Sequence, residues 1–396
     1  MTALTDRIQE KVDWLFPQLV AWRRHFHEHP ELSFQEQETA AFVYDRLADF
    51  GGYELSRPTE TSVVARLITG RPGPTLALRA DMDALPIQEE NALDFASKIP
   101  GVMHACGHDG HTAMLLGAAK LLAEQRSSLR GELRLFFQHA EELFPGGGQQ
   151  LVDAGVMEGV DTVVGAHLGS SLPTGKIGVC LGAMMAAPDT FSITVVGSGG
   201  HAAHPNQTVD SVAIAAQVIT NLQHIVARNI DPLDSIVVSV TQLQAGTADN
   251  VIPGSAWMGG TVRSLDPALR DSMPQRLERV VRGICEAHGA HYSFEYRRGY
   301  RPVINDATVT EWVAEVVRSE LGGEHLEVIR PSMGGEDFSA YQQKAPGSFF
   351  IVGSGNPDLE SDFPHHHPRF TIDEAAMRNG VVVFIGLVHK ILATAS

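Results

Sequence analysis

The middle of the chain constrains the fold most strongly, because six regular elements follow one another there in the order βαββαβ. Short runs rich in β-branched and aromatic residues predict the strands, and longer runs with helical periodicity predict the helices. The expected elements are strand 190–196, helix 210–228, strands 235–242 and 256–262, helix 267–288 and strand 292–296. This order is typical of a ferredoxin-like domain, in which two helices cover one face of a small sheet.

The segments on either side of this domain predict a larger α/β domain. Helical periodicity covers residues 6–49, and apolar strand-like runs follow at 62–68, 75–80, 132–138 and 162–168. Helical runs separate several of these strands. The clearest covers 113–124, with Thr112 as its candidate N-cap, and a last helix begins near residue 373. We therefore expect an aminopeptidase-like α/β/α domain from residues 1–185 and 300–396, with the ferredoxin-like domain inserted at 186–299. Two domains also suit a chain of 396 residues.

Charge and cysteine content exclude several classes of protein. The formal net charge of -17 at pH 7 argues against binding to nucleic acid or to an anionic membrane, because phosphates would be repelled. No segment is long and apolar enough to span a bilayer, and the first residues lack a secretion signal. The three cysteines lie far apart and cannot form a closed disulfide framework. We expect a cytoplasmic protein.

Residues 104–111 concentrate one cysteine and three histidines in eight positions. Cys106 and His108 alternate, so on an extended segment both side chains would face one ion or two adjacent ions. Clusters of acidic and imidazole side chains recur at 138–142, 165–168 and 365–368. Several of these clusters sit at the ends of apolar runs, where α/β sheets carry their ligand sites. The sequence therefore predicts a metal site.

Glu141 and Glu142 follow one of the predicted strands. Neighbouring residues on an extended segment point in opposite directions, so Glu142 could bind metal while Glu141 faces a water as general base. His167 closes another strand. One histidine of 365–367 is a further candidate, because Pro368 restrains the backbone before it.

Other polar residues near these clusters are expected to orient the metal ligands through hydrogen bonds. They are Asp81, Asp83, His104, His111 and His139. The histidines at positions 25, 27 and 29 are spaced by two on a predicted helix end, which spreads them around the helix. We interpret those three as structural.

Nearly the whole chain resembles the M20 metallopeptidase family, in its amidohydrolase branch of hippurate hydrolases, N-acyl-amino-acid amidohydrolases and auxin-conjugate hydrolases. The matching segments are 27–33, 79–86, 104–111, 138–142, 199–205, 246–253, 260–263, 331–338 and 366–368. The resemblance implies two divalent metal ions per subunit, manganese or zinc, with cobalt and nickel as further candidates. The implied ligands are Cys106, which would bridge the two ions, and His108, Glu142, His167 and His366.

The resemblance also implies roles for residues outside the ligand set. Glu141 would activate water, and His201 of a dimer partner would stabilise the oxyanion. Asn250, Arg263 and Gly335 would contact the substrate. The inserted domain would act as a dimerisation and lid domain, in a homodimer or a higher homo-oligomer.

Three positions depart from the family pattern and leave the acyl group of the substrate open. His139 stands where the family commonly has proline, and the segments 168–171 and 363–365 are unusual. The sequence thus predicts a metal-dependent amidohydrolase that cleaves N-acyl amino acids, such as hippurate-like or N-acetyl substrates. One alternative is a dipeptidase or carboxypeptidase of the same family. A second is a thiol hydrolase with Cys106 as nucleophile and His108 or His111 as base, and a third is a small-molecule binding protein without catalysis.

Overall fold

The computed structural model describes residues 2–394, which cluster into two units. Unit 1 combines the chain up to Met184 with Ile304–Pro331 and the segment from Asp337 onward, and unit 2 combines Met185–Val303 with Ser332–Glu336. The expected boundaries, at 185/186 and 299/300, lie close to these. The short segment Ser332–Glu336 was not expected in unit 2, so each unit contains more than one stretch of the chain.

Unit 1 is built on an eight-stranded mixed sheet with the strand order β1-β2-β4-β3-β5-β16-β6-β15. Its strands are β1 (Glu54–Ser56), β2 (Val63–Ile68), β3 (Thr75–Asp81), β4 (Glu132–Gln138), β5 (Thr162–Pro173), β6 (Ile177–Val179), β15 (Leu326–Val328) and β16 (Gly347–Gly355). The central strands β4, β3, β5 and β16 run parallel. Their carboxyl ends therefore meet at one edge of the sheet, which is where ligand sites form in such sheets.

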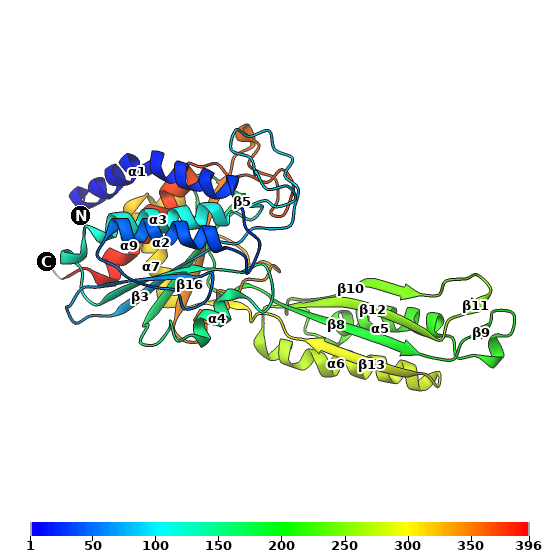
Figure 1. Ribbon diagram of the computed structural model, residues 1–396. Helices are drawn as coiled ribbons and strands as arrows, with labels where there is room; N and C mark the ends of the chain where they lie inside the picture. The colour runs from blue at the N-terminus through cyan, green and yellow to red at the C-terminus, as the bar shows by residue number, and fades with distance from the viewer. Residues whose placement is uncertain (1, 395–396) are drawn as a thin grey trace. The chain divides into compact units, whose positions relative to one another are not determined.

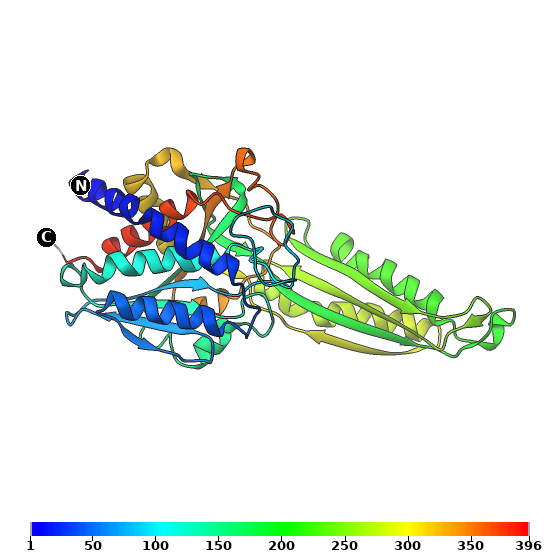
Figure 2. The same ribbon diagram turned by 45° about the horizontal axis from the view of Figure 1, so that its top comes forward.

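Helices cover this sheet, and α3 is the innermost of them (Figures 1 and 2). They are α1 (Thr2–Glu28), α2 (Gln37–Phe50), α3 (His108–Ala123), α4 (Gly147–Asp153), α7 (Ala307–Glu320), α8 (Ser339–Gln342) and α9 (Ala376–Leu392). α3 packs against α1, α9 and β3, and nearly all of its residues are buried. Gly117 permits this packing, because a Cβ atom there would collide with Leu19 of α1.

One expectation about a helix limit was wrong. α3 begins at His108 rather than near residue 113, because Gly107 adopts a left-handed conformation (φ 91°) and turns the chain directly into the helix. Thr112 therefore lies inside α3 and is not its N-cap, and its hydroxyl donates to the backbone oxygen of Asp81 (2.8 Å). The helical periodicity of 6–49 corresponds to two helices, α1 and α2, and α1 ends at Glu28, among the histidines where a helix end was expected.

Unit 2 has the ferredoxin-like fold predicted from its element order (Figure 1). Its four strands pair antiparallel in the order β10-β12-β8-β13. The elements are β8 (Ala187–Val196), β9 (Gly200–His201), α5 (Ser211–Asn229), β10 (Ile236–Ala245), β11 (Val251–Ile252), β12 (Ser255–Ser264), α6 (Pro267–Ala287) and β13 (His291–Arg297). Two further strands, β7 (Gly182–Met185) and β14 (Val303–Asn305), contain two of the points where the chain passes between the units, and the other two flank Ser332–Glu336.

Alternation along the strands of unit 2 explains why helices cover only one face of the sheet. In β8, Phe191, Ile193 and Val195 are buried in the core formed with α5 and α6. The residues that alternate with them are polar, including Thr190 and Ser192, and they face the open side. No helix within residues 2–394 is both long and apolar enough to cross a membrane.

Candidate metal centre

Five side chains expected to bind metal meet in unit 1, at the carboxyl ends of the parallel strands and the start of α3. This metal cluster consists of Cys106, His108, Glu142, His167 and His366. The donor atoms of Cys106, His108 and His167 lie within 4.8 Å of one another, and so do those of Cys106, Glu142 and His366. Ligands of one ion at bond lengths of about 2.0–2.3 Å have similar spacings. Because both groups contain Cys106, its sulfur is placed where it could bridge two ions.

Backbone contacts orient the two buried histidines of the cluster. Nδ1 of His108 donates to the backbone oxygen of Asp83 (2.9 Å), and Nδ1 of His167 donates to that of Leu168 (2.8 Å). Each ring therefore directs the lone pair of Nε2 toward the cluster. Nε2 of His167 lies 3.5 Å from Cys106 Sγ, and Nε2 of His108 is buried without a hydrogen-bond partner among the described residues. A cation would satisfy that nitrogen, so the residues fit a metal site.

The electrostatics of the cluster favour cations. Burial raises the pKa of the Cys106 thiol well above its usual value, and the nearby carboxylates of Glu142 and Glu141 raise it further. Burial alone would lower the pKa of His108, but the carboxylates around it, among them Asp81 and Asp83, outweigh burial and raise that pKa to about 10. The metal-free site therefore holds protons that divalent cations can replace. A raised thiol pKa also argues against Cys106 as a nucleophile, which requires the thiolate.

Asp81 and Asp83 lie where they can orient the cluster, as the sequence suggested. Asp81 accepts from Nη1 of Arg79 (2.6 Å) and from Nδ1 of His111 (2.6 Å). The other ring nitrogen of His111 accepts from the backbone of Leu168 (2.8 Å), next to His167. Asp83 contacts His108 and also holds the chain that carries the two glutamates.

The extended conformation expected around the proposed ligands was wrong in two places. Cys106 precedes the left-handed turn at Gly107, and a second left-handed residue, Ala140 (φ 48°), precedes Glu141 and Glu142. Because of this turn, the two glutamates do not point to opposite sides. Instead, carboxylate oxygens of both lie within 4.8 Å of a ring nitrogen of His108.

The histidine run at 365–367 brings two rings to the cluster rather than one. Nε2 of His366 lies 3.1 Å from Glu142 Oε1, and Nδ1 of His365 lies 3.6 Å from Cys106 Sγ. His367 is occupied elsewhere, because its ring stacks on Phe363 and accepts from the backbone of Arg369. The sequence did not predict the proximity of His365.

Two histidines expected to orient the metal ligands, His139 and His104, have other surroundings, and so does His27, which was interpreted as structural. His139 bonds to Gln150 Oε1 (2.9 Å) rather than to a proposed ligand. His104 is buried, and neither ring nitrogen forms a hydrogen bond with the described residues. His27 lies between Asp109 (2.8 Å) and Glu89 (3.1 Å), which agrees with a structural interpretation.

The candidate substrate residues of unit 2 fall into two pairs at opposite ends of its sheet. His201 of β9 pairs with Val251 of β11, beside Asn250. Arg263 of β12 is the register partner of Pro188, and Gly335 is close enough to Pro188 that a Cβ atom would collide with it. From Ser255, the register partner of Val196, to Arg263 the chain of β12 makes eight steps, or about 26 Å at 3.3 Å per residue.

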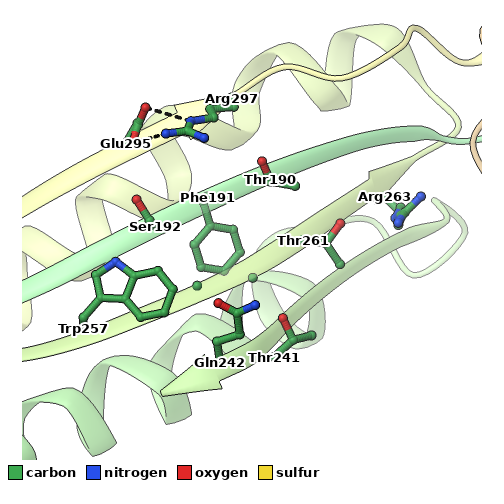
Figure 3. Close-up of a pocket in the computed structure, with 12 residues that line it drawn as sticks. Thr190, Phe191, Ser192, Thr241, Gln242, Trp257, Thr261, Arg263, Glu295 and Arg297 are labelled. Carbon is green, nitrogen blue, oxygen red and sulfur yellow. Dashed lines mark hydrogen bonds and ion pairs between the residues drawn. The ribbon is translucent and has the colours of Figure 1, made fainter. Parts of the chain in front are cut away.

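Arg263 lines an open hollow on the uncovered face of the sheet in unit 2 (Figure 3). Its guanidinium group forms no hydrogen bond or ion pair with the described residues, whereas the nearby Arg297 is paired with Glu295. Partial burial lowers the pKa of Arg263. An unpaired guanidinium group has the geometry to bind a carboxylate with two hydrogen bonds.

Comparison with known proteins shows the family of the chain. Residues 77–390 match the sequence profile of Peptidase family M20/M25/M40. The chain belongs to this family. A relative named N-acyl-L-amino acid amidohydrolase, from Geobacillus stearothermophilus, is 62% identical over 300 residues, which cover 76% of this chain and 81% of the relative. An N-acetylcysteine deacetylase of Bacillus subtilis is 43% identical over 377 residues, which cover 95% of this chain and 97% of that one.

Solved M20 structures share the fold. A Bacillus subtilis protein, described as a dinuclear metal binding peptidase from the M20 family, is 38% identical and superposes with a TM-score of 0.84. The match covers 96% of this chain and 99% of that one. The expected α/β fold and membership of the M20 hydrolases are thus confirmed.

Proposed function

We propose that this M20 protein is a two-metal amidohydrolase that cleaves the amide bond between an acyl group and the nitrogen of an amino acid. The observation that carries the proposal is the pair of donor groups sharing Cys106, with the Glu141 carboxylate beside them. The names of the relatives support this substrate class. Manganese and zinc are the proposed ions, with cobalt and nickel as further candidates, because thiolate, imidazole and carboxylate donors suit such metals.

Glu141 is the proposed general base. The two ions, when bound, supply polarisation of the scissile carbonyl and acidify water. Glu141 is largely buried, and its amide is fixed by Asp83 Oδ1 (3.0 Å), so its carboxylate is held beside the cluster. It removes a proton from water and then delivers that proton to the leaving nitrogen. The products are a carboxylic acid and a free amino acid.

A second copy of the chain completes each site in this proposal. Within one chain, about 26 Å of β12 separates Arg263 from the end of the sheet near His201, which exceeds the length of a small acyl amino acid. One substrate therefore cannot contact both residues of the same chain. We assign Arg263 and Gly335 to the chain that holds the substrate. His201 and Asn250 come from a partner in a homodimer or higher homo-oligomer, where His201 stabilises the oxyanion.

We also propose a cytoplasmic location. All three cysteines are buried and unpaired, which suits a reducing compartment.

The reaction is tested by release of free amine from a panel of N-acyl amino acids, including benzoyl-glycine and N-acetyl amino acids. Dipeptides and longer peptides in the same panel test the dipeptidase and carboxypeptidase alternatives. Protein stripped with a chelator should be inactive and should regain activity with manganese or zinc. Activity that persists without metal would contradict the proposal, as would metal-loaded protein that binds these substrates without releasing product.

The roles of Glu141 and His201 are tested together. Glu141→Gln should retain two metal ions and lose turnover, and metal loss in that variant would contradict its role as base. Co-expressed Glu141→Gln and His201→Ala chains should regain about one quarter of wild-type activity, because half of randomly formed dimers are mixed and each has one intact site. No recovery in verified mixed dimers would exclude contribution of His201 across an interface.

A further inference from the structure

Glu36 is a buried carboxylate whose side chain does not cap the helix that it precedes. It occupies the N-cap position of α2, yet its side chain accepts no hydrogen bond from that helix. The residue has no exposed surface. Its Oε1 atom accepts instead from the backbone nitrogen of Phe34 (3.1 Å) and from that of Ala140 (2.8 Å), which is 104 positions away along the chain. The carboxylate thus connects the loop before α2 to the loop after β4.

The residue that Glu36 holds has an unfavourable backbone conformation. Ala140 is left-handed (φ 48°), which is disfavoured for any residue with a Cβ atom. Its backbone oxygen accepts from Gly147 (2.9 Å), and its nitrogen donates to Glu36. Without the bond to Glu36, Ala140 could relax toward negative φ. That rotation would occur directly before Glu141 and would redirect its side chain.

Two buried carboxylates accept hydrogen bonds from the backbone of the loop after β4. Glu36 accepts from the amide of Ala140, while Asp83 accepts from those of Glu141 and Glu142 at 3.0 Å each. Asp83 also contacts His108, so its removal would disturb the metal cluster directly. The hydrogen bonds of Glu36 go to Phe34 and Ala140, which lie outside the metal cluster, so its effect on the base can be separated from an effect on metal binding.

Placing Glu36 here is electrostatically unfavourable. Burial raises its pKa, and the neighbouring Asp83 adds to this, bringing the pKa to about 7. Oε2 of Glu36 is also buried without a hydrogen-bond partner among the described residues. A charged group in this position stabilises the fold poorly, and the contacts that favour its charged form include the amide of Ala140 and the side chain of Thr61.

We propose that Glu36 is a positioning residue for the amidohydrolase reaction, which holds Ala140 in its left-handed turn and thereby aims the Glu141 carboxylate. The inference rests on the proposed role of Glu141 as general base. It extends the catalytic machinery of unit 1 to the loop between α1 and α2, which contains none of the proposed metal ligands.

The kinetic test compares Glu36→Ala and Glu36→Gln with Glu38→Gln, a control on the exposed side of α2. Glu36→Ala should lower kcat by about 10- to 100-fold, because small misplacements of a catalytic group have effects of this size. KM and the content of two metal ions should stay unchanged. Glu36→Gln keeps an acceptor oxygen and should retain intermediate activity, while Glu38→Gln should match the wild type. A kcat within twofold of wild type in Glu36→Ala would overturn the proposal.

A second measurement does not depend on activity or metal. Hydrogen exchange of the metal-free protein should be faster in the peptide covering 140–142 for both Glu36 variants and unchanged for Glu38→Gln. Unchanged exchange there would overturn the proposal, even if Glu36→Ala folds poorly, because Glu36→Gln preserves the size of the side chain. Uniformly faster exchange across unit 1 would also overturn it, since that indicates a general structural role.

A double variant separates this inference from the proposed function. In a Glu141→Gln background, Glu36→Ala should cause no further loss of residual turnover, because both changes act through the same carboxylate. An additional loss equal to that in the wild-type background would overturn the role of Glu36. Wild-type protein that releases no amine from any substrate would instead contradict the proposed function, while the exchange result would still report whether Glu36 holds the loop.

Discussion

Replacing Asp83 with asparagine gives the sharpest test of how the loop after β4 is held. Oδ1 of Asp83 accepts from the amide of Glu141 and Oδ2 from that of Glu142, both at 3.0 Å, and Oδ2 also accepts from the hydroxyl of Ser33 (2.7 Å). Asparagine has the same shape but presents an amino group in place of one oxygen. At least one amide would then face a donor instead of an acceptor, whichever way the new side chain turns.

The size of the effect follows from the bond that is lost. A hydrogen bond to a charged group contributes about 1.5–3 kcal/mol, which corresponds to roughly 10- to 150-fold at 1.4 kcal/mol per tenfold change. If the amino group faces Glu142, the loss should appear in the Kd for metal. If it faces Glu141, the loss should appear in kcat at saturating metal.

Both the Kd for metal and kcat must be measured to interpret the effect of Asp83→Asn. Metal Kd is measured by competition with a chromophoric chelator, and kcat by amine release from the best acyl amino acid at saturating metal. Asp94→Asn is the matched control, because Asp94 is exposed in the same part of unit 1. If Asp83→Asn and the control both stay within threefold of wild type in Kd and kcat, the reasoning about this carboxylate is refuted.

Three further variants test the cluster and the buried charges of unit 1. Cys106→Ala should lower the affinity for both ions, because both donor groups share its sulfur. Metal analysis after gel filtration should find fewer than two ions per chain, whereas the control Cys180→Ala should bind metal normally. Arg23→Ala removes the guanidinium partner of buried Asp109 (2.8 Å) and should lower the free energy of unfolding by about 3–5 kcal/mol in urea titrations. A decrease of less than about 1 kcal/mol would contradict a stabilising role of this ion pair. In metal-free protein, the pKa of Glu36 is raised from 4.5 to about 7, so the folded state binds the proton more tightly than the unfolded state does. The contribution of Glu36 to the free energy of unfolding is therefore fully present below pH 4.5 and is lost as the pH rises through 7. Relative to wild type, Glu36→Gln should therefore gain up to about 3 kcal/mol in unfolding free energy between pH 5 and pH 8, and a pH-independent difference would contradict the shift.

The ferredoxin-like domain could be predicted from sequence because its signals are local. Strand alternation and helical periodicity are visible within single segments, and capping residues mark the helix starts. Asp210 caps α5 by accepting from Val212 and Ala213, and Asp266 caps α6 by accepting from Leu269. Each of these contacts joins residues no more than three positions apart, which is the range that a sequence pattern reports.

The features of the site that could not be predicted depend on long-range contacts or on unusual backbone angles. Glu36 and Ala140 are separated by 104 positions, and no periodicity links an acidic residue to an amide so far along the chain. The left-handed turns at Gly107 and Ala140 place the proposed ligands differently from the extended segments expected there. The residue types of the cluster could be identified from their density, but the proximity of His365 to Cys106 required the folded chain.

Because unit 1 is formed from separate stretches of the sequence, its parts are synthesised at different times. Four residues of the metal cluster precede Met184, whereas His366 follows the whole of Met185–Val303. β16, which covers the edge of β5, also comes after that insertion. A nascent chain therefore presents β5 as an open edge while the ribosome makes unit 2, a stage at which unpaired strands are prone to aggregate. On the proposed ligand set, the donor group that contains His366 would be completed only after translation has passed that residue, whereas Cys106, His108 and His167 are made earlier.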